Sequence, residues 1–316
     1  MNDGWEYFDQ IDNIYHGINL VKYLTMKYNH SSEAEWEERI KKGEIKINNQ
    51  IIQIDKAIYS KDLIIWNRSP WEEESVPSKF KVLFDNGDLF IIDKPSGIPV
   101  IAGGGFLKHT IANLLKHHSK NNNELIHPKP IHRLGRFTSG VLICARKKET
   151  RAEINKCLRN ADKGVNSIKR IYRGLAKPNS LLSINQSIKI TYSIIKEKHP
   201  KLGFIWNCTK NQTPFTYNKA LESLSEVKLL EKRINEDLLE INISTGRPHQ
   251  IRIHLASIDT PLIGDPLYKG NCKVSEDSRP GEGGFKLHSH KIENIIVKNK
   301  VFSFEAEPPE LLKISK

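Results

Sequence analysis

The chain has 316 residues, of which 38% are hydrophobic and 27% are charged. These proportions are typical of a folded globular protein and exclude a disordered or fibrous chain. No stretch of about 18 apolar residues occurs, which argues against a membrane-spanning helix, and the acidic start lacks the features of a signal peptide. The four cysteines are scattered without a Cys-x-x-Cys pair, so neither a disulfide framework nor a zinc knuckle is indicated. We therefore expect a cytoplasmic protein with no membrane contact.

The charge is unevenly distributed. The chain carries 49 Lys and Arg against 37 Asp and Glu, a net charge of +12. Residues 1–79 hold ten basic and fourteen acidic side chains, so the remainder carries a net charge of +16. An excess of this size attracts polyanions, of which nucleic acid is the usual cytosolic example. A genome-wide base-composition bias would also enrich lysine, and the charge by itself leaves both explanations open.

The N-terminal segment contains two helix signals. Apolar residues at helical spacing between Ile18 and Leu24 predict a first helix. Ser32 followed by Glu35 forms a capping-box pattern, which predicts the start of a second helix that ends at Gly43.

Short strands follow these helices. Residues 44–52 favour two strand pieces around an Asn-Asn turn at Asn48, and residues 62–66 favour a third. We expect a small α/β domain over residues 1–66 and a linker, rich in Pro and Glu, over residues 67–79.

From residue 80 onward the pattern favours strands. Residues 81–84 and 89–92 flank Asp85-Asn-Gly-Asp88, which predicts a hairpin with a two-residue turn. Further strands are expected over 140–145, 169–175, 187–194, 203–209, 227–232 and 238–244, and helices over 110–118, 149–159 and 247–257, the last with Pro248 in its first turn. Residues 80–316 are thus predicted to form an α+β domain on a mixed, mostly antiparallel sheet.

Two candidate ligand sites are weak. Gly103-Gly-Gly105 lacks the Lys-Ser/Thr of a phosphate-binding loop, so a flexible loop is the preferred interpretation. The twelve histidines lack carboxylate or thiolate partners at ligand spacing, so no metal site is expected.

Two polar segments are more informative. Residues 131–140 place a histidine and two arginines before an apolar strand. In residues 244–254, helical spacing puts His249 with Arg252 and Gln250 with His254, giving two adjacent rows of polar side chains. Planar donors in rows suit phosphate or base recognition.

Five segments together resemble the RluA family of pseudouridine synthases, in the order in which that family carries them. They are Lys94-Pro-Ser-Gly97, His132-Arg-Leu to Thr138-Ser-Gly140, Lys169-Arg-Ile-Tyr172, Thr245 to Leu255, and Gly264-Asp-Pro-Leu-Tyr268. The likeness runs from about Phe80 to Pro309, and the N-terminal domain is similar to the α-L RNA-binding module of many members. The resemblance implies a pseudouridine-synthase-like fold and the isomerisation of uridine to pseudouridine in rRNA or tRNA, by a monomer without a cofactor.

The resemblance also implies roles for individual residues. The target base leaves its stack and enters a pocket, where Tyr172 covers it and Arg252 orients the reacting carboxylate. Arg133 fills the gap that the base leaves. The residues expected to contact RNA are His132, Arg133, Arg136, Arg247, His249, Gln250 and Lys94.

One position departs from the family. The catalytic aspartate of the family follows His-Arg-Leu, and this chain has Gly135 there, as a sub-group from plants and photosynthetic bacteria does. Glycine has no side chain to act as nucleophile or base. Another carboxylate must replace it, with Asp265 as the first candidate and Asp93 and Asp85 after it. The alternative is a catalytically inactive RNA-binding protein.

Overall fold

The computed structural model describes residues 1–28, 31–159, 168–184, 186–199, 202–211, 220–278 and 283–315. The chain divides into two compact units, Met1–Glu73 with Lys198–Gly203, and Glu74–Glu197 with Phe204–Lys316. The strand β4 runs to Arg68, so the border expected at residue 66 falls inside it.

The first unit contains a four-stranded antiparallel sheet in the order β1-β4-β2-β3. Its elements are β1 (Trp5–Gln10), α1 (Leu20–Lys27), α2 (Glu33–Lys41), β2 (Ile45–Ile47), β3 (Gln50–Ile52) and β4 (Leu63–Arg68). The capping box of α2 is confirmed, and positive φ angles at Asn48 and Asn49 form the expected tight turn between β2 and β3. The sequence did not predict β1, because this edge strand is mostly exposed and lacks a clear apolar alternation.

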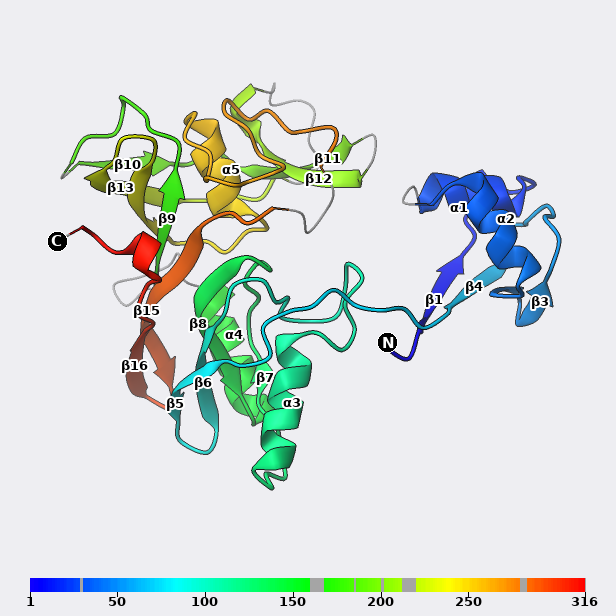
Figure 1. Cartoon of the computed structure of the whole chain (residues 1–316), viewed down its shortest axis with the longest axis horizontal. Helices are drawn as coiled ribbons and strands as arrows, with labels where there is room; N and C mark the ends of the chain where they lie inside the picture. The colour runs from blue at the N-terminus through cyan, green and yellow to red at the C-terminus, as the bar shows by residue number, and fades with distance from the viewer. Residues whose placement is uncertain are drawn as a thin grey trace. The chain divides into compact units, whose positions relative to one another are not determined.

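The second unit is built on a ten-stranded sheet in the order β10-β13-β14-β9-β15-β8-β6-β5, with β16 beside β15 and β7 beside β8 (Figure 1). Its strands are β5 (Lys81–Asp85), β6 (Leu89–Lys94), β7 (Lys129–Pro130), β8 (Thr138–Ala145), β9 (Lys169–Ala176), β10 (Ser187–Ile190), β13 (Ser225–Lys232), β14 (Asp237–Ile243), β15 (Leu287–Val297) and β16 (Lys300–Glu305). The strands β11 (Ile194–His199) and β12 (Gly203–Cys208) form a separate pair, and the helices are α3 (Ile111–Asn121), α4 (Lys148–Arg159) and α5 (Gln250–Ser257). The mixed, mostly antiparallel α+β architecture is confirmed, with β8 and β15 as its parallel pair.

The two faces of the sheet carry separate apolar cores, because side chains alternate along each strand. Phe90 and Ile92 of β6 lie in the first core, which α3 and α5 cover and which includes Tyr172. Leu89 and Ile91 lie in the second core, on the side of α4.

At Gly140 the strands β8 and β15 approach so closely that a Cβ atom would lie 2.2 Å from the carbonyl oxygen of Ser289, and φ is +103°. Only glycine fits such a position.

Three local expectations are corrected. The helix α5 begins at Gln250 and not at residue 247, so Pro248 precedes it, and His249 before it has a left-handed φ of 55°. The β5–β6 hairpin has a longer turn than expected, in which Asn86 Oδ1 accepts from the backbone of Asp88 and Leu89. Residues 187–194 are not one strand but β10 and the first residue of β11, and β15 and β16 were not anticipated.

Within the part of the chain that the structure describes, no helix is both long and apolar enough to cross a bilayer.

Candidate active site

The loop that contains Gly135 is tied to the loop that follows β6. The buried Lys94 donates from Nζ to the carbonyl oxygens of Pro95, at 2.8 Å, and Arg136, at 3.1 Å. The backbone of Gly97 donates to Arg136, and Arg136 Nε donates back to the carbonyl oxygen of Gly97, both at 2.9 Å. The path of the chain through Gly135 is therefore fixed from outside the loop.

Lys94 is fully buried, and removal from water lowers its pKa to about 7. Its ammonium group is occupied by backbone oxygens, so the expectation that Lys94 contacts RNA is wrong for this structure. It holds the loop of Gly135 in place instead.

Position 135 could hold a side chain if Thr138 shifted by a few tenths of an ångström. The φ of Gly135 is outside the left-handed region, and a Cβ atom there would meet Thr138 Oγ1 at 3.3 Å and Phe285 Cζ at 3.6 Å. Glycine is therefore not needed here for backbone freedom, and a side chain at this position would be directed toward Thr138 and Phe285.

Phe285 connects this loop to Arg252. The guanidinium carbon of Arg252 lies 4.6 Å from the centre of the Phe285 ring and 4.8 Å from that of Tyr268. Arg252 is thus held between two aromatic rings, which favours a cation. Phe285 was missed at the sequence level, because one phenylalanine after two glycines gives no periodic or motif signal.

Asp265 fixes the direction of Arg252. Its Oδ2 accepts from Arg252 Nε at 2.6 Å and its Oδ1 from Arg252 Nη2 at 2.7 Å. Oδ1 also accepts from the backbone of Leu267 and Tyr268, and the Asp265 side chain is only 1% exposed. This carboxylate is surrounded by donors and withdrawn from solvent, an arrangement that positions Arg252.

His249 extends the same network. Tyr268 donates its hydroxyl proton to the carbonyl oxygen of Trp206 at 2.8 Å, and His249 Nδ1 lies 2.8 Å from that hydroxyl. His249 Nδ1 must therefore carry the proton and donate it. Its desolvated surroundings and the charge of Arg252 lower the pKa of His249 to about 4, so the imidazole is neutral with Nε2 unprotonated.

The second polar row of α5 is internal. Gln250 donates to the carbonyl oxygen of Leu224 and to Ser225 Oγ, and its Oε1 accepts from Thr245 Oγ1 and the backbone of Arg247. With four hydrogen bonds and 3% exposure, Gln250 is not placed to contact RNA, and that expectation is corrected. His254 is likewise buried.

Two arginine candidates, Arg133 and Arg136, line one cavity. Arg133 is exposed and, with Leu134, Arg136 and residues 99–103, lines a cavity of about 260 Å³. Arg136 also pairs with Glu74 at 2.6 Å. Neither Tyr172 nor Arg252 lines this cavity, so it is not a cleft that these two residues share with Arg133.

His132 and Arg247 make structural contacts. His132 Nε2 accepts from the backbone of Ile143 at 3.1 Å, and burial lowers its pKa to about 4. Arg247 Nε donates to the carbonyl oxygen of Glu222 at 2.8 Å.

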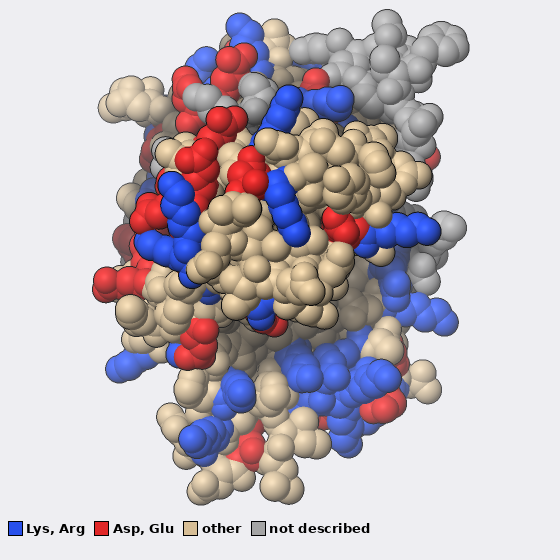
Figure 2. All heavy atoms as spheres, turned by 90° about the vertical axis from the view of Figure 1, so that its right-hand side faces the viewer, with Lys and Arg blue, Asp and Glu red and all other residues tan. Residues whose placement is uncertain are grey.

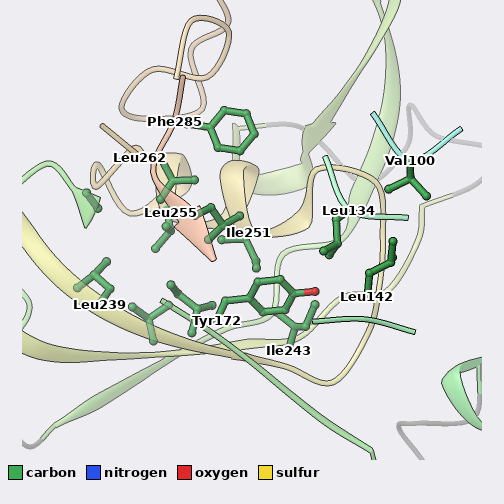
Figure 3. Packing of buried hydrophobic residues seen from close by; sticks show 14 of the residues in the cluster. Val100, Leu134, Leu142, Tyr172, Leu239, Ile243, Ile251, Leu255, Leu262 and Phe285 are labelled. Atoms are coloured by element: carbon green, nitrogen blue, oxygen red, sulfur yellow. The ribbon is translucent and has the colours of Figure 1, made fainter. Parts of the chain in front are cut away.

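Tyr172 lies inside the first apolar core, on β9 between β14 and β15. Figure 3 shows its ring beside Ile251 and Ile243, with the hydroxyl directed to the side where Leu134 and Leu142 lie. The residue is 8% exposed, and burial raises the pKa of its hydroxyl. Leu134, Ile251 and Phe285 belong to the same core, so Tyr172 is connected by packing to the residues next to Gly135 and Arg252.

The two other candidate carboxylates lie elsewhere. Asp93 follows Leu89 and Ile91 on the face of β6 opposite to Tyr172. Asp85 forms a two-pronged pair with Arg146 and is aligned with Phe90, roughly 13 Å along β6 from Lys94. Neither can replace a side chain at position 135 in this structure.

Two further features concern the binding of ions, namely metal-ligating side chains and the distribution of surface charge. Among the described residues, no set of three or more His, Cys, Asp and Glu is placed to hold a metal ion. Figure 2 shows a group of Lys and Arg atoms with few Asp and Glu atoms among them on one part of the visible face, and mixed charges on another.

Comparisons with known proteins show the family to which this chain belongs. The model of the RNA pseudouridylate synthase family matches residues 88–257, more than half of the chain, and the chain belongs to this family. It is similar to an uncharacterized RNA pseudouridine synthase of Synechocystis sp., with 34% identity over 86% of this chain and 88% of the relative. RNA pseudouridine synthase 5 of Arabidopsis thaliana is 28% identical over 99% of this chain and 95% of its own.

A solved structure shows a similar fold. The solved structure of human RNA pseudouridylate synthase domain containing 1 matches 77% of this chain and 89% of its own, with a TM-score of 0.55 and 17% identity. The chain is therefore an isomerase of the pseudouridine synthase family, whose members convert uridine to pseudouridine in RNA.

Proposed function

We propose that this protein isomerises uridine in structured RNA, rRNA or tRNA, and that the target uracil binds where Gly135, Phe285 and Arg252 meet. The observation that carries this proposal is the Arg252–Asp265 pair, whose two short hydrogen bonds fix a cation against Phe285, the ring that a side chain at residue 135 would also meet. Breaking the glycosidic bond and joining the uracil through carbon exchanges bonds without net oxidation, so no redox cofactor is needed.

The proposed roles follow the contacts. Arg252 orients the reacting groups, Asp265 positions Arg252, and Tyr172 with Phe285 forms the apolar side of the base-binding surface. The exposed Arg133 enters the gap that the flipped base leaves in the RNA. His132 and Arg136, with Arg247 and His249, shape the surrounding surface.

The glycine at position 135 favours a second candidate, an RNA-binding protein without catalysis. Asp265 is surrounded by donors, and Asp93 and Asp85 lie elsewhere. None of these three candidate carboxylates is therefore free to act beside Arg252.

One experiment separates the two candidates. The purified full chain is incubated with total cellular RNA labelled with tritium at the uracil carbon that forms the new bond, and tritium release and pseudouridine are measured. We expect release by the wild type, and a Gly135→Asp variant within about tenfold of it. A well-folded wild type without release would refute catalysis. If Gly135→Asp then released tritium at least ~100-fold faster than this inactive wild type, the rate gain that a general base provides, the binding-only function would be supported. Gly135→Ala is the matched control, because it adds Cβ without a carboxylate.

We also propose that the first unit is an α-L-type RNA-binding module and that the protein is a cytoplasmic monomer. The two helices and the short sheet support this assignment, as does the guanidinium of Arg39, which lies 4.5 Å from the Trp36 ring centre. Binding of a single-stranded RNA probe should weaken with salt by about 0.7 log units per decade for each phosphate contacted. In an Arg39→Gln variant, a salt dependence of binding that is weaker by about 0.7 log units per decade would support the module. An unchanged salt dependence would contradict it.

A further inference from the structure

Two cysteines meet beside the loop that holds Arg252. Cys208 ends β12, and Cys272 lies a few residues after Tyr268. Their Sγ atoms are 2.7 Å apart, so no other atom separates them, and the residues are only 1% and 9% exposed. Both are free thiols, 64 positions apart in the chain. Such a contact between remote segments is what a disulfide requires.

The surroundings of the pair favour a thiolate. Lys210 Nζ donates to the carbonyl oxygen of Ser257 and lies 3.4 Å from Asn271 Oδ1, which places its positive charge near the pair. The hydrogen bond with Cys272, and after it the backbone and charge of Lys210, lower the pKa of Cys208 to about 7, whereas the pKa of Cys272 is raised. One sulfur of the pair is thus prepared as a nucleophile and the other retains its proton.

The loop of Cys272 also carries the partners of Arg252. Asp265 and Tyr268 stand at its start, and the backbone of Ser275 donates to Leu267 at 2.9 Å to close it. Tyr268 donates to the carbonyl oxygen of Trp206, two residues before Cys208. A bond between the two sulfurs would therefore join segments that already pack together.

We propose that Cys208 and Cys272 form an oxidisable dithiol, which a peroxide converts to a disulfide that locks the 265–275 loop against β12. The Cys208 thiolate attacks a peroxide oxygen, breaks the O–O bond and becomes a sulfenic acid, and hydroxide leaves. The Cys272 sulfur then attacks the sulfenic sulfur and displaces a second hydroxide. The proton of Cys272 and one from solvent convert the hydroxides to water. In sum, two electrons pass from the sulfurs to the peroxide, and a small thiol reductant reverses the step.

The disulfide would close a covalent ring around α5, the helix that carries Arg252. A ring of this size restricts the unfolded chain considerably, and we expect the melting temperature to rise by roughly 10 °C on oxidation. The Arg252–Asp265 contacts remain, because the sulfurs approach each other without displacing an intervening group.

The test uses the purified full chain treated with a small excess of hydrogen peroxide and then with a thiol-blocking reagent. Peptide mass spectrometry should find a Cys208–Cys272 linked peptide that has lost two hydrogen atoms, and the melting temperature should rise and return with dithiothreitol. Cys208→Ser and Cys272→Ser should each abolish both changes. Cys157→Ser is the matched control and should leave both changes intact. Cys157 is more exposed than the pair, but its thiol bonds only weakly, at 3.8 Å, to the carbonyl oxygen of Ile296.

Several outcomes would overturn the proposal. They are the recovery of both cysteines as blocked free thiols, over-oxidation of Cys208 without a link, or a linked peptide that involves Cys157 or Cys144. Because the readouts are thiol state and melting temperature, they are independent of whether the chain isomerises uridine.

Discussion

In the candidate site, the Arg252 side and the Gly135 side are both fixed by several hydrogen bonds, but position 135 itself has no side chain to present to a substrate. Asp265, Tyr268 and Phe285 hold Arg252. Lys94 and the Gly97–Arg136 contacts hold the loop of Gly135. The scaffold that places a residue at position 135 is therefore present without the carboxylate. The difference between the two sides shows that a chain can keep the hydrogen-bonded framework of a site without the reactive side chain that the framework would hold.

The largest effect is expected from a pair of glycine variants. Gly140→Ala places Cβ against a backbone oxygen at a positive φ and should lower the free energy of unfolding by about 4 kcal/mol or more. Gly135→Ala, its matched control in the same segment, should stay within about 1 kcal/mol of the wild type. Urea denaturation measures both. A large loss of unfolding free energy in Gly135→Ala would show that the loop needs glycine at this position. The view that the Gly135 side is a complete framework without its carboxylate would then be wrong.

The next effect concerns the Arg252 side. Arg252→Met leaves Asp265 as a buried charge without its partner and should lower the free energy of unfolding by about 3 kcal/mol. Asp265→Asn serves as the second single variant, and the double variant should cost less than the sum of the two. Additive costs would mean that the two side chains do not stabilise each other.

A smaller effect is expected from Lys94→Met on the Gly135 side. Losing two hydrogen bonds to backbone oxygens should cost about 2 kcal/mol. Because the pKa of Lys94 is lowered from 10.5 to about 7, the unfolded chain binds more protons between these pH values. The stability of the wild type should therefore rise with pH across this window, and more steeply than that of Lys94→Met. Parallel stability profiles, from denaturation at each pH, would contradict the buried position of Lys94.

The last effect, which develops only at acidic pH, concerns the internal row of α5. His254 contacts Ser225 Oγ and the carbonyl oxygen of Tyr192, and burial lowers its pKa from 6.5 to about 4. Stability should fall as the pH drops from 6.5 to 4, with at most about 1.4 kcal/mol per pH unit from this group. His254→Gln should flatten the profile, whereas His117→Gln, at an exposed position on α3, should leave it unchanged. Equal flattening by both variants would exclude a special role for His254.

The elements with strong local signals were predicted well. The capping box at Ser32, the Asn-Asn turn, and the apolar strands β8 and β14 depend on residues close together in the chain. The start of α5 was wrong because the left-handed His249 depends on its contact with Tyr268, which is remote in sequence.

The chemistry of the site was predicted in part. The sequence segments that contain Arg252 and Asp265 were both predicted to belong to the site. The distance of 2.6 Å between these two side chains shows that the segments meet. Helical spacing puts Gln250 and Arg252 in different rows of side chains. Spacing places both on one helix but does not say which row faces Ser225 and which faces Asp265.

The sequence by itself determined the class of fold, the absence of a carboxylate at position 135 and the uneven charge, because these follow from residue identity and local periodicity. Only the tertiary structure decided that Asp265 is occupied by Arg252, that Asp93 faces the opposite side of the sheet, and that Cys208 meets Cys272. These facts depend on strand register and loop packing, which bring together groups that no local pattern relates.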